Sequence, residues 1–290
     1  MIWQLSINGL IAGSVYALVA LGFTIIYGTV RFFHFAHGAV YVAGAYLAWL
    51  AVEQLGMPVI PAVVSACFLA GVIGILIDLA IYRPLRAQKS PNLVFLIASF
   101  GIFIFIQNLL QLLFGAQILT LRTSPVSEGY HILSAVITPI QLLILSASLT
   151  IVILLRLLVN RMKMGKAMTA VADNPLGASV AGINPEKVIL SAFAVGPALA
   201  GMAGVLVSLE TNIEPAMGMN AIMKGVIASI IGGIGSIPGA VLGGFFLGLA
   251  ENLGIWKIQA GWKDTIAFGI LILFLLFRPQ GILGAKEDRI

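Results

Sequence analysis

Charged side chains are scarce in this chain, and their scarcity excludes a water-soluble fold. Asp, Glu, Lys and Arg make up 9% of its 290 residues, whereas soluble proteins carry about 25%. Hydrophobic residues make up 60%, more than a soluble domain can cover with polar surface. Because only segments that satisfy their own backbone hydrogen bonds are stable in hydrocarbon, we expect an all-α, polytopic transmembrane helical bundle.

Cysteine is almost absent, since Cys67 is the only one. A single cysteine excludes an intrachain disulfide and a cysteine-rich zinc site. Residues 1–30 carry no charge, so the basic segment that opens a cleavable signal peptide is missing. We therefore expect the first apolar run to remain as a membrane span. The formal net charge of +5 comes mainly from loop lysines and arginines, so it does not indicate nucleic-acid binding.

Catalytic and nucleotide-binding motifs are also missing. Gly165-Lys166-Ala167 is followed by the wrong residues for a phosphate-binding loop. The glycine-rich stretch 232–239 misses the dinucleotide-binding spacing by one residue and follows no strand, so we interpret it as a turn between two helices. No nucleophile–base constellation is evident. The chain is predicted to be no enzyme and to hold no cofactor.

Two of the three histidines, His34 and His37, lie three residues apart. They could reach one metal ion, but no carboxylate or cysteine lies nearby to complete a ligand set. We predict no metal site. Instead we expect these histidines to place a helix end at the membrane boundary, with Phe32, Phe33 and Phe35 as interfacial anchors.

Apolar runs between charges and Pro/Gly positions predict nine helices. They are expected at 5–30, 38–52, 59–81, 92–114, 139–160, 187–209, 221–235, 238–254 and 262–278. The second, seventh and eighth are short against the roughly 20 residues that a span needs. Any of these could be a broken or re-entrant helix, so the sequence is compatible with either eight or nine membrane crossings.

Loop charges predict the orientation of the bundle. Positive residues dominate three loops, which are expected to be cytoplasmic: Arg83, Arg86 and Lys89; Arg156, Arg161, Lys163, Lys166 and Lys187, against Asp173 and Glu186; and Arg278, Lys286 and Arg289. Two other loops are expected outside: 115–138, with Arg122, Glu128 and His131, and the acidic loop with Glu210 and Glu214. A count of nine spans then places the N-terminus outside and Arg31 inside.

Small residues at four-residue spacing predict close helix packing, because they let two backbones approach in lipid. Three stripes have this spacing: Gly9, Gly13 and Ala17; Gly196, Ala200 and Gly204; and Gly235, Gly239 and Gly243. We expect a tightly packed bundle.

A few polar residues lie inside the expected spans. Gln107 and Gln111 share a face of the fourth helix with Asn108 beside them, and Asn8 lies in the first helix. Such groups form hydrogen bonds between helices or line a hydrated pathway, and the sequence leaves both roles open.

Charged residues are expected only near the ends of spans. Asp78 is expected to pair with Arg83, and Glu251 and Asn252 lie at the end of the eighth helix near Lys257. We find no charge clearly at the middle of a span, which disfavours an ion-coupled transporter.

The cytoplasmic loop at about 161–187 has the most distinctive pattern. Asn174-Pro175 and Asn184-Pro185 mark turns, with small and apolar residues between them. This pattern predicts a short amphipathic helix on the cytoplasmic surface.

Several motifs together resemble permeases of branched-chain amino acid ABC importers, the LivH/LivM type, with LivH the nearer of the two. The resemblance runs from about residue 5 to 280. It rests on Asn8-Gly9-Leu10, Tyr16-Ala17-Leu18-Val19-Ala20-Leu21-Gly22, Tyr27-Gly28, Phe35-Ala36-His37-Gly38, Gly44-Ala45-Tyr46, the loop just described and the glycine-rich stretch 232–240. His34 departs from the family, which usually has asparagine there.

The resemblance implies a single transmembrane permease domain over 1–290 in the inner (plasma) membrane. It implies a coupling helix at about Ala170 to Gly182 that docks on an ATPase, with the matching positions Gly165, Lys166, Ala170, Asp173, Asn174, Pro175, Gly182 and Asn184. Candidate pathway residues are Asn8, Tyr16, His37, Gln107, Asn108 and Gln111. The implied partners are two ABC ATPase subunits, a second homologous permease and a periplasmic substrate-binding protein.

Other functions remain open at this point. Close relatives in the family import urea or short amides, so the substrate does not follow from the resemblance. A stand-alone secondary transporter or channel fits the short helices, although it fits the lack of a midspan charge less well. A membrane-embedded enzyme fits least, because the chain lacks a catalytic cluster.

Overall fold

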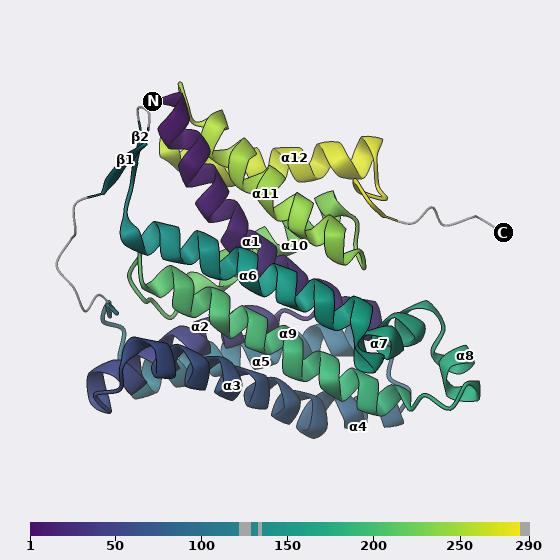
Figure 1. Ribbon diagram of the computed structural model, residues 1–290. Coiled ribbons are helices and arrows are strands. Elements are labelled where there is room, and N and C mark those ends of the chain that lie inside the picture. Colours follow the sequence, from purple (N-terminus) through teal and green to yellow (C-terminus); the bar gives the residue numbers. More distant parts are fainter. Residues whose placement is uncertain (122–128, 133–134, 285–290) are drawn as a thin grey trace.

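The computed structural model describes residues 1–121, 129–132 and 135–284 (Figure 1). The long helices are α1 (Ile2–Val30), α2 (Ala36–Trp49), α3 (Val59–Ile77), α5 (Asn92–Phe114), α6 (Pro139–Arg161), α9 (Pro185–Ser208), α10 (Met217–Gly232), α11 (Ile237–Gly254) and α12 (Lys263–Phe277). Shorter elements are π-helical turns at Leu50–Gln54 and Asp78–Tyr82, α4 (Arg83–Ala87), α7 (Lys163–Asp173), α8 (Pro175–Val180), a 3-10 turn at Ala260–Trp262, and strands β1 (Tyr130–Ile132) and β2 (Ala135–Ile137). The predicted all-α polytopic bundle is confirmed.

Each of the nine expected apolar helices is present in the described part of the chain, with ends within four residues of the prediction. Seven segments there are long and apolar enough to cross a membrane. The exceptions are α2 and α10, two of the three helices predicted to be short; the third, α11, has 18 residues and is among the seven. The antiparallel hairpin β1–β2, with Tyr130 opposite Ile137, was not expected.

Loops expected outside meet at one end of the bundle, which we call the N-terminal end. The Gln4 side chain exchanges two hydrogen bonds with the Val136 backbone, of 2.8 and 3.0 Å. Leu119 and Ile213 exchange two backbone hydrogen bonds, of 3.1 and 2.8 Å. The loop before α6 and the loop after α9 therefore lie together beside the start of α1 (left in Figure 1).

Loops expected to be cytoplasmic meet at the opposite end, which we call the α7–α8 end (right in Figure 1). Arg31 donates to the Ala172 carbonyl at 2.6 Å, and Arg86 pairs with Glu186 at 2.9 Å. The membrane side of each end stays a prediction. The expected charges Arg122, Glu128, Lys286 and Arg289 lie outside the described residues.

The centre of the bundle is α1, the most buried of the long apolar helices. It packs against α11 through Gly9 and Gly13. A Cβ on Gly13 would lie 2.8 Å from Phe245 Cα, and one on Gly9 would lie 3.0 Å from the Gly248 carbonyl oxygen. Glycine is required at this crossing because the two backbones touch.

The second glycine stripe packs in the same way, since Gly196 meets Ile26 of α1 and Gly204 meets the backbone of Tyr41. The third stripe differs from the prediction. Gly239 and Gly243 pack against α10, but Gly235 lies before α11 at φ 88°, where a Cβ would meet nothing within 4 Å. Ser236 caps α11 by accepting a hydrogen bond from the Gly239 N–H, so residue 235 belongs to the turn.

The connection between α1 and α2 is partly buried against neighbouring helices. His34 is fully buried and Phe32 nearly so, and Ser99 of α5 accepts hydrogen bonds from the N–H groups of Phe35 and Ala36. Phe32 and His34 are therefore core residues and not the expected boundary residues, while Phe33 and Phe35 are half-buried. Irregular backbone is tolerated at membrane depth where protein groups satisfy it, and Ser99 does this.

Asp78 pairs with Arg86 at 2.6 Å, not with Arg83 as expected. The reason is the π-helical turn at Asp78–Tyr82, in which the Arg83 N–H donates to the Asp78 carbonyl five residues back. This wider turn rotates the following residues, so that Arg86 comes over the face that carries Asp78. Arg83 instead approaches Glu186, at 3.9 Å.

Candidate functional site

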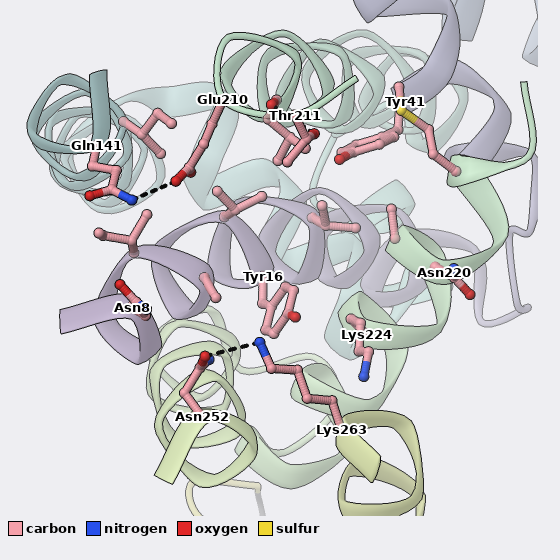
Figure 2. Close-up of a pocket in the computed structure, with 18 residues that line it drawn as sticks. Asn8, Tyr16, Tyr41, Gln141, Glu210, Thr211, Asn220, Lys224, Asn252 and Lys263 are labelled. Carbon is pink, nitrogen blue, oxygen red and sulfur yellow. Dashed lines mark hydrogen bonds between the residues drawn. The ribbon is translucent and has the colours of Figure 1, made fainter. Parts of the chain in front are cut away.

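A cavity of about 440 Å³ lies beside α1, toward the N-terminal end of the bundle (Figure 2). Residues of seven helices (α1, α2, α6, α9, α10, α11 and α12) and of the segment after α9 line it. Its lining residues are Asn8, Ile11, Ala12, Val15, Tyr16, Val19, Tyr41, Gln141, Ile144, Val207, Glu210, Thr211, Met217, Asn220, Ala221, Lys224, Asn252 and Lys263. The volume is in the range of small-molecule sites, which span roughly 300–1,000 Å³.

One face of α1 forms a wall of the cavity. Asn8, Val15 and Val19 share this wall with their neighbours at three- and four-residue spacing, because the helical period places such positions on one side. The adjacent stripe with Gly9 and Gly13 is used for packing against α11. The same helix therefore supplies both the close contact that holds the bundle and the wall of the cavity.

The lining combines aliphatic and polar side chains, and two groups of the polar ones lie where helices meet. The first lies where α6 starts and α9 ends, where Gln141 donates a hydrogen bond of 2.6 Å to Glu210. The second lies where α10, α11 and α12 meet, and contains Lys224, Lys263 and Asn252. Figure 2 shows the two clusters on different sides of the α1 wall.

The second cluster contains a buried network of charges. Lys224 Nζ contacts Glu251 and lies 2.7 Å from Asp264 Oδ1. Tyr16 donates a hydrogen bond of 3.0 Å to the other Glu251 oxygen. Lys263 donates to Asn252 Oδ1 at 3.0 Å. Four helices, α1, α10, α11 and α12, are thereby joined at one place.

The sequence analysis does not predict this network of charges. The seventh helix was expected to begin at residue 221, which placed Lys224 at its start, whereas α10 begins at Met217 and holds Lys224 near its middle. The expectation of no charge at the middle of an apolar helix is therefore wrong for α10. Glu251 meets Lys224, while Lys257 lies over the Trp256 ring. A lone lysine in an otherwise uncharged apolar run was the available signal.

Of the predicted pathway residues, the structure brings Asn8 and Tyr16 to the cavity. His37 is fully buried elsewhere, with Nε2 3.3 Å from the Val19 carbonyl oxygen. Asn108 is exposed and donates to the Ile104 carbonyl of its own helix. Gln107 is half-buried and Gln111 exposed on the same helix, α5. These four positions do not line the described cavity.

His34 and His37 lie side by side, with ring centroids 6.1 Å apart. His34 Nδ1 is 2.9 Å from the Tyr82 hydroxyl. Within the described ranges, no group of three or more His, Cys, Asp or Glu side chains could hold a metal ion.

The loop expected to carry one short helix contains two, α7 and α8. Pro175 cannot continue α7 because it has no N–H, and Asn174 caps α8 by accepting a hydrogen bond of 2.9 Å from the Gly177 N–H. Asn184 caps α9 in the same way through the Lys187 N–H. The short helix predicted between the two Asn-Pro turns is therefore present as α8, whereas the range 170–182 implied by the resemblance covers the end of α7 and all of α8.

The surface of α8 is apolar and uncovered. Leu176 is 80% exposed and Val180 is 91% exposed. Asp173 and Lys166 are also exposed, Ala170 is half-buried, and Gly165 packs closely against Val159. Gly182 turns the chain toward α9 with φ 84°. In Figure 1, α7 lies at the right-hand ends of the long helices and α8 lies beyond them.

Nearly the whole chain is similar to known membrane transport proteins. A family model described as the permease component of the branched-chain amino acid transport system matches residues 5–275. The chain is 39% identical to the high-affinity branched-chain amino acid transport system permease protein BraD of Pseudomonas aeruginosa, over 98% of this chain and 96% of that protein. It is 37% identical to the corresponding protein LivH of Escherichia coli K12, with the same coverage.

A more distant relative also matches over nearly the whole chain. The chain is 26% identical to a probable branched-chain amino acid transport permease protein LivH of Methanocaldococcus jannaschii, over 98% of this chain and 93% of the relative. No solved structure gives a significant match.

Proposed function

The chain belongs to the family of permease components of branched-chain amino acid transport systems, and on this premise we propose that the cavity beside α1 is part of its substrate pathway. Members are transport components and not catalytic ones. The resemblance inferred from the sequence motifs is confirmed. The chain is a multi-pass protein of the inner membrane, and we propose that it forms one transmembrane permease domain.

The observation that supports the cavity is its combination of surfaces. Aliphatic side chains line part of it, which suits a branched hydrocarbon substrate, and charged groups line two of its sides. A zwitterionic amino acid needs both kinds of surface, because its side chain is apolar and its α-groups are charged. The positive-inside rule places the N-terminal end outside, so the cavity would receive substrate from that side.

We propose that α7 and α8 form the contact with an ATPase subunit. Leu176 and Val180 of α8 are exposed apolar side chains, and α8 lies beyond the ends of the long helices in Figure 1. Arg31 ties the end of α7 to the end of α1 through the Ala172 carbonyl. A displacement of α7 would therefore reach α1, which forms a wall of the cavity.

Family membership implies an ABC complex. The partners we propose are two ATPase subunits, a second homologous permease and an extracytoplasmic substrate-binding protein. The interface positions would be Leu176, Val180 and the exposed residues Lys166 and Asp173.

The test is an affinity pull-down of the tagged chain in mild detergent, followed by mass spectrometry and an ATPase assay. We expect two ATPase subunits and a second permease to be recovered, and hydrolysis to rise with a loaded binding protein. The ligand on that protein would distinguish an amino acid from urea or a short amide. Recovery of the chain alone, with uptake into vesicles without nucleotide, would overturn the proposal.

A stand-alone transporter has one observation in its favour. Lys224 and Glu251 are buried charges inside the bundle, and such groups often mark coupled transport. The match to the permease family over nearly the whole chain outweighs this, and the vesicle experiment separates the two.

A further inference from the structure

The charges beside the α10–α12 side of the cavity are balanced. Lys224 and Lys263 carry two positive charges, and both line the cavity. Glu251 and Asp264 carry two negative charges, and both contact Lys224. Balance is expected here, because an uncompensated charge inside a membrane protein is costly.

The two carboxylates differ in how firmly they are held. Glu251 is fully buried, and it accepts hydrogen bonds from both Lys224 and Tyr16. The Asp264 side chain is 65% exposed, and its contact is with Lys224. Asp264 lies in the first turn of α12, the least buried of the long apolar helices. Release of Asp264 into water therefore costs far less than release of Glu251.

We propose that the carboxylate of the substrate takes the place of Asp264 at Lys224. This inference rests on the proposed function and adds a specificity-determining residue to it. Without substrate, Asp264 neutralises Lys224. When an amino acid enters the cavity, its carboxylate binds Lys224 and Asp264 turns to solvent, so Lys224 keeps a second carboxylate partner beside Glu251. Lys263, 3.0 Å from Asn252 Oδ1, adds positive charge on the same side.

The surroundings of Lys224 suit the rest of such a ligand. Asn220 and Ala221, one turn earlier on α10, face the same cavity, and Val15 and Val19 of α1 supply an apolar surface. A neutral amide or urea has no carboxylate to exchange for Asp264. The arrangement therefore selects carboxylate-bearing substrates over short amides.

The test uses the purified permease–ATPase complex without binding protein. Binding of L-leucine and of L-leucinamide, which lacks the carboxylate, is measured by ligand-observed NMR, because this method detects weak affinities. Asp264→Asn removes the competing carboxylate and keeps the side-chain size. Lys224→Met combined with Glu251→Gln removes the lysine without leaving a buried carboxylate unpaired. Lys257 is exposed and lies over the Trp256 ring, so Lys257→Met is the control for loss of one positive charge.

We expect the wild-type complex to prefer L-leucine to L-leucinamide. Asp264→Asn should bind L-leucine up to roughly fivefold more tightly, the ratio that corresponds to loss of a partly exposed ion pair. The double variant should bind L-leucine roughly tenfold more weakly and lose its preference over L-leucinamide, since hydrogen bonds to charged groups are worth about that ratio. Lys257→Met should behave as wild type.

Weaker binding of L-leucine by Asp264→Asn, or a retained preference in the double variant, would overturn the inference. A wild-type complex that transports leucine while showing either result leaves the proposed function intact. If the wild-type chain recruits no ATPase, the proposed function itself fails. The two failures are thus distinguishable.

Discussion

The Tyr16 hydroxyl donates a hydrogen bond of 3.0 Å to Glu251 Oε2, and so joins α1 to α11 across 235 positions of the chain. Glu251 is fully buried, and its other oxygen accepts from Lys224. This hydrogen bond therefore connects α1, which forms a wall of the cavity, with the buried charges beside the cavity.

Loss of this hydroxyl should weaken the bundle. Tyr16→Phe removes one of the two partners of a buried carboxylate, and a hydrogen bond to a charged group contributes about 1.5–3 kcal/mol. We expect a lower Tm of the purified complex and slower uptake in proteoliposomes. Tyr27→Phe, farther along α1, is the control, and an unchanged Tm in Tyr16→Phe would contradict the role given to the bond.

Gly13 should not tolerate a methyl group. Gly13→Ala places a Cβ 2.8 Å from Phe245 Cα, and overpacking of this kind costs about 1–3 kcal/mol. Gly101→Ala is the matched control, because a Cβ on Gly101 of α5 meets nothing within 4 Å. Thermal unfolding of both variants should show a clear loss for the first and none for the second.

Arg86 and Arg83 should differ sharply although they lie one helical turn apart. Arg86→Met leaves Asp78, whose side chain is 1% exposed, as a buried carboxylate without its partner, at a cost of about 3–5 kcal/mol. Arg83→Met removes an exposed contact of 3.9 Å, worth about 0–1 kcal/mol. Yield and Tm check the difference, and Asp78→Asn should restore much of the stability lost in Arg86→Met.

Ser99 and Ser148 form a second matched pair, since both are fully buried. Ser99→Ala removes the acceptor for the Phe35 and Ala36 N–H groups, and unsatisfied buried donors cost about 1–3 kcal/mol each. Ser148 Oγ has no hydrogen-bond partner among the described residues, so Ser148→Ala should be neutral. Equal Tm values for both variants would contradict the support of the α1–α2 connection by Ser99.

The exposed surface of α8 should matter for coupling and not for folding. Leu176→Ser and Val180→Ser change side chains that are 80% and 91% exposed, so the Tm of the isolated permease should stay within roughly the surface-substitution range of ±0.5 kcal/mol. Uptake should fall together with recovery of the ATPase. Asp173→Arg, at the end of α7, is expected to abolish uptake in the same way, and Ser179→Ala is the control. Normal uptake in all three changed proteins would remove α8 from the interface.

Local signals made the helices predictable. Asn184-Pro185 before α9 and Thr138-Pro139 before α6 contain a capping side chain followed by proline, and the structure shows the caps. The apolar runs between such positions have the length of a span. The predicted helix ends were least accurate where no capping side chain followed by proline marks the boundary. One example is α10, which begins at Met217, four residues earlier than expected.

The cavity was only partly predictable. Asn8 and Tyr16 were identified as polar residues or motif positions, but Gln107 and Asn108 satisfied the same criterion and lie elsewhere. Polarity within a span does not say which neighbour a helix face will meet. The pairing of Lys224 with Glu251 depends on how α10 and α11 cross, which no local pattern encodes.

The buried segment at 31–35 has a consequence for how the protein is made. Its backbone is satisfied by Ser99, a residue 64 positions after Phe35, and His34 packs against Phe193, with ring centroids 5.3 Å apart. When the ribosome releases α2, neither support exists, and lipid satisfies no backbone hydrogen bond. We therefore expect the segment to reach its buried position only after α5 and α9 have been synthesised, so that its integration follows the order of assembly and not the order of translation.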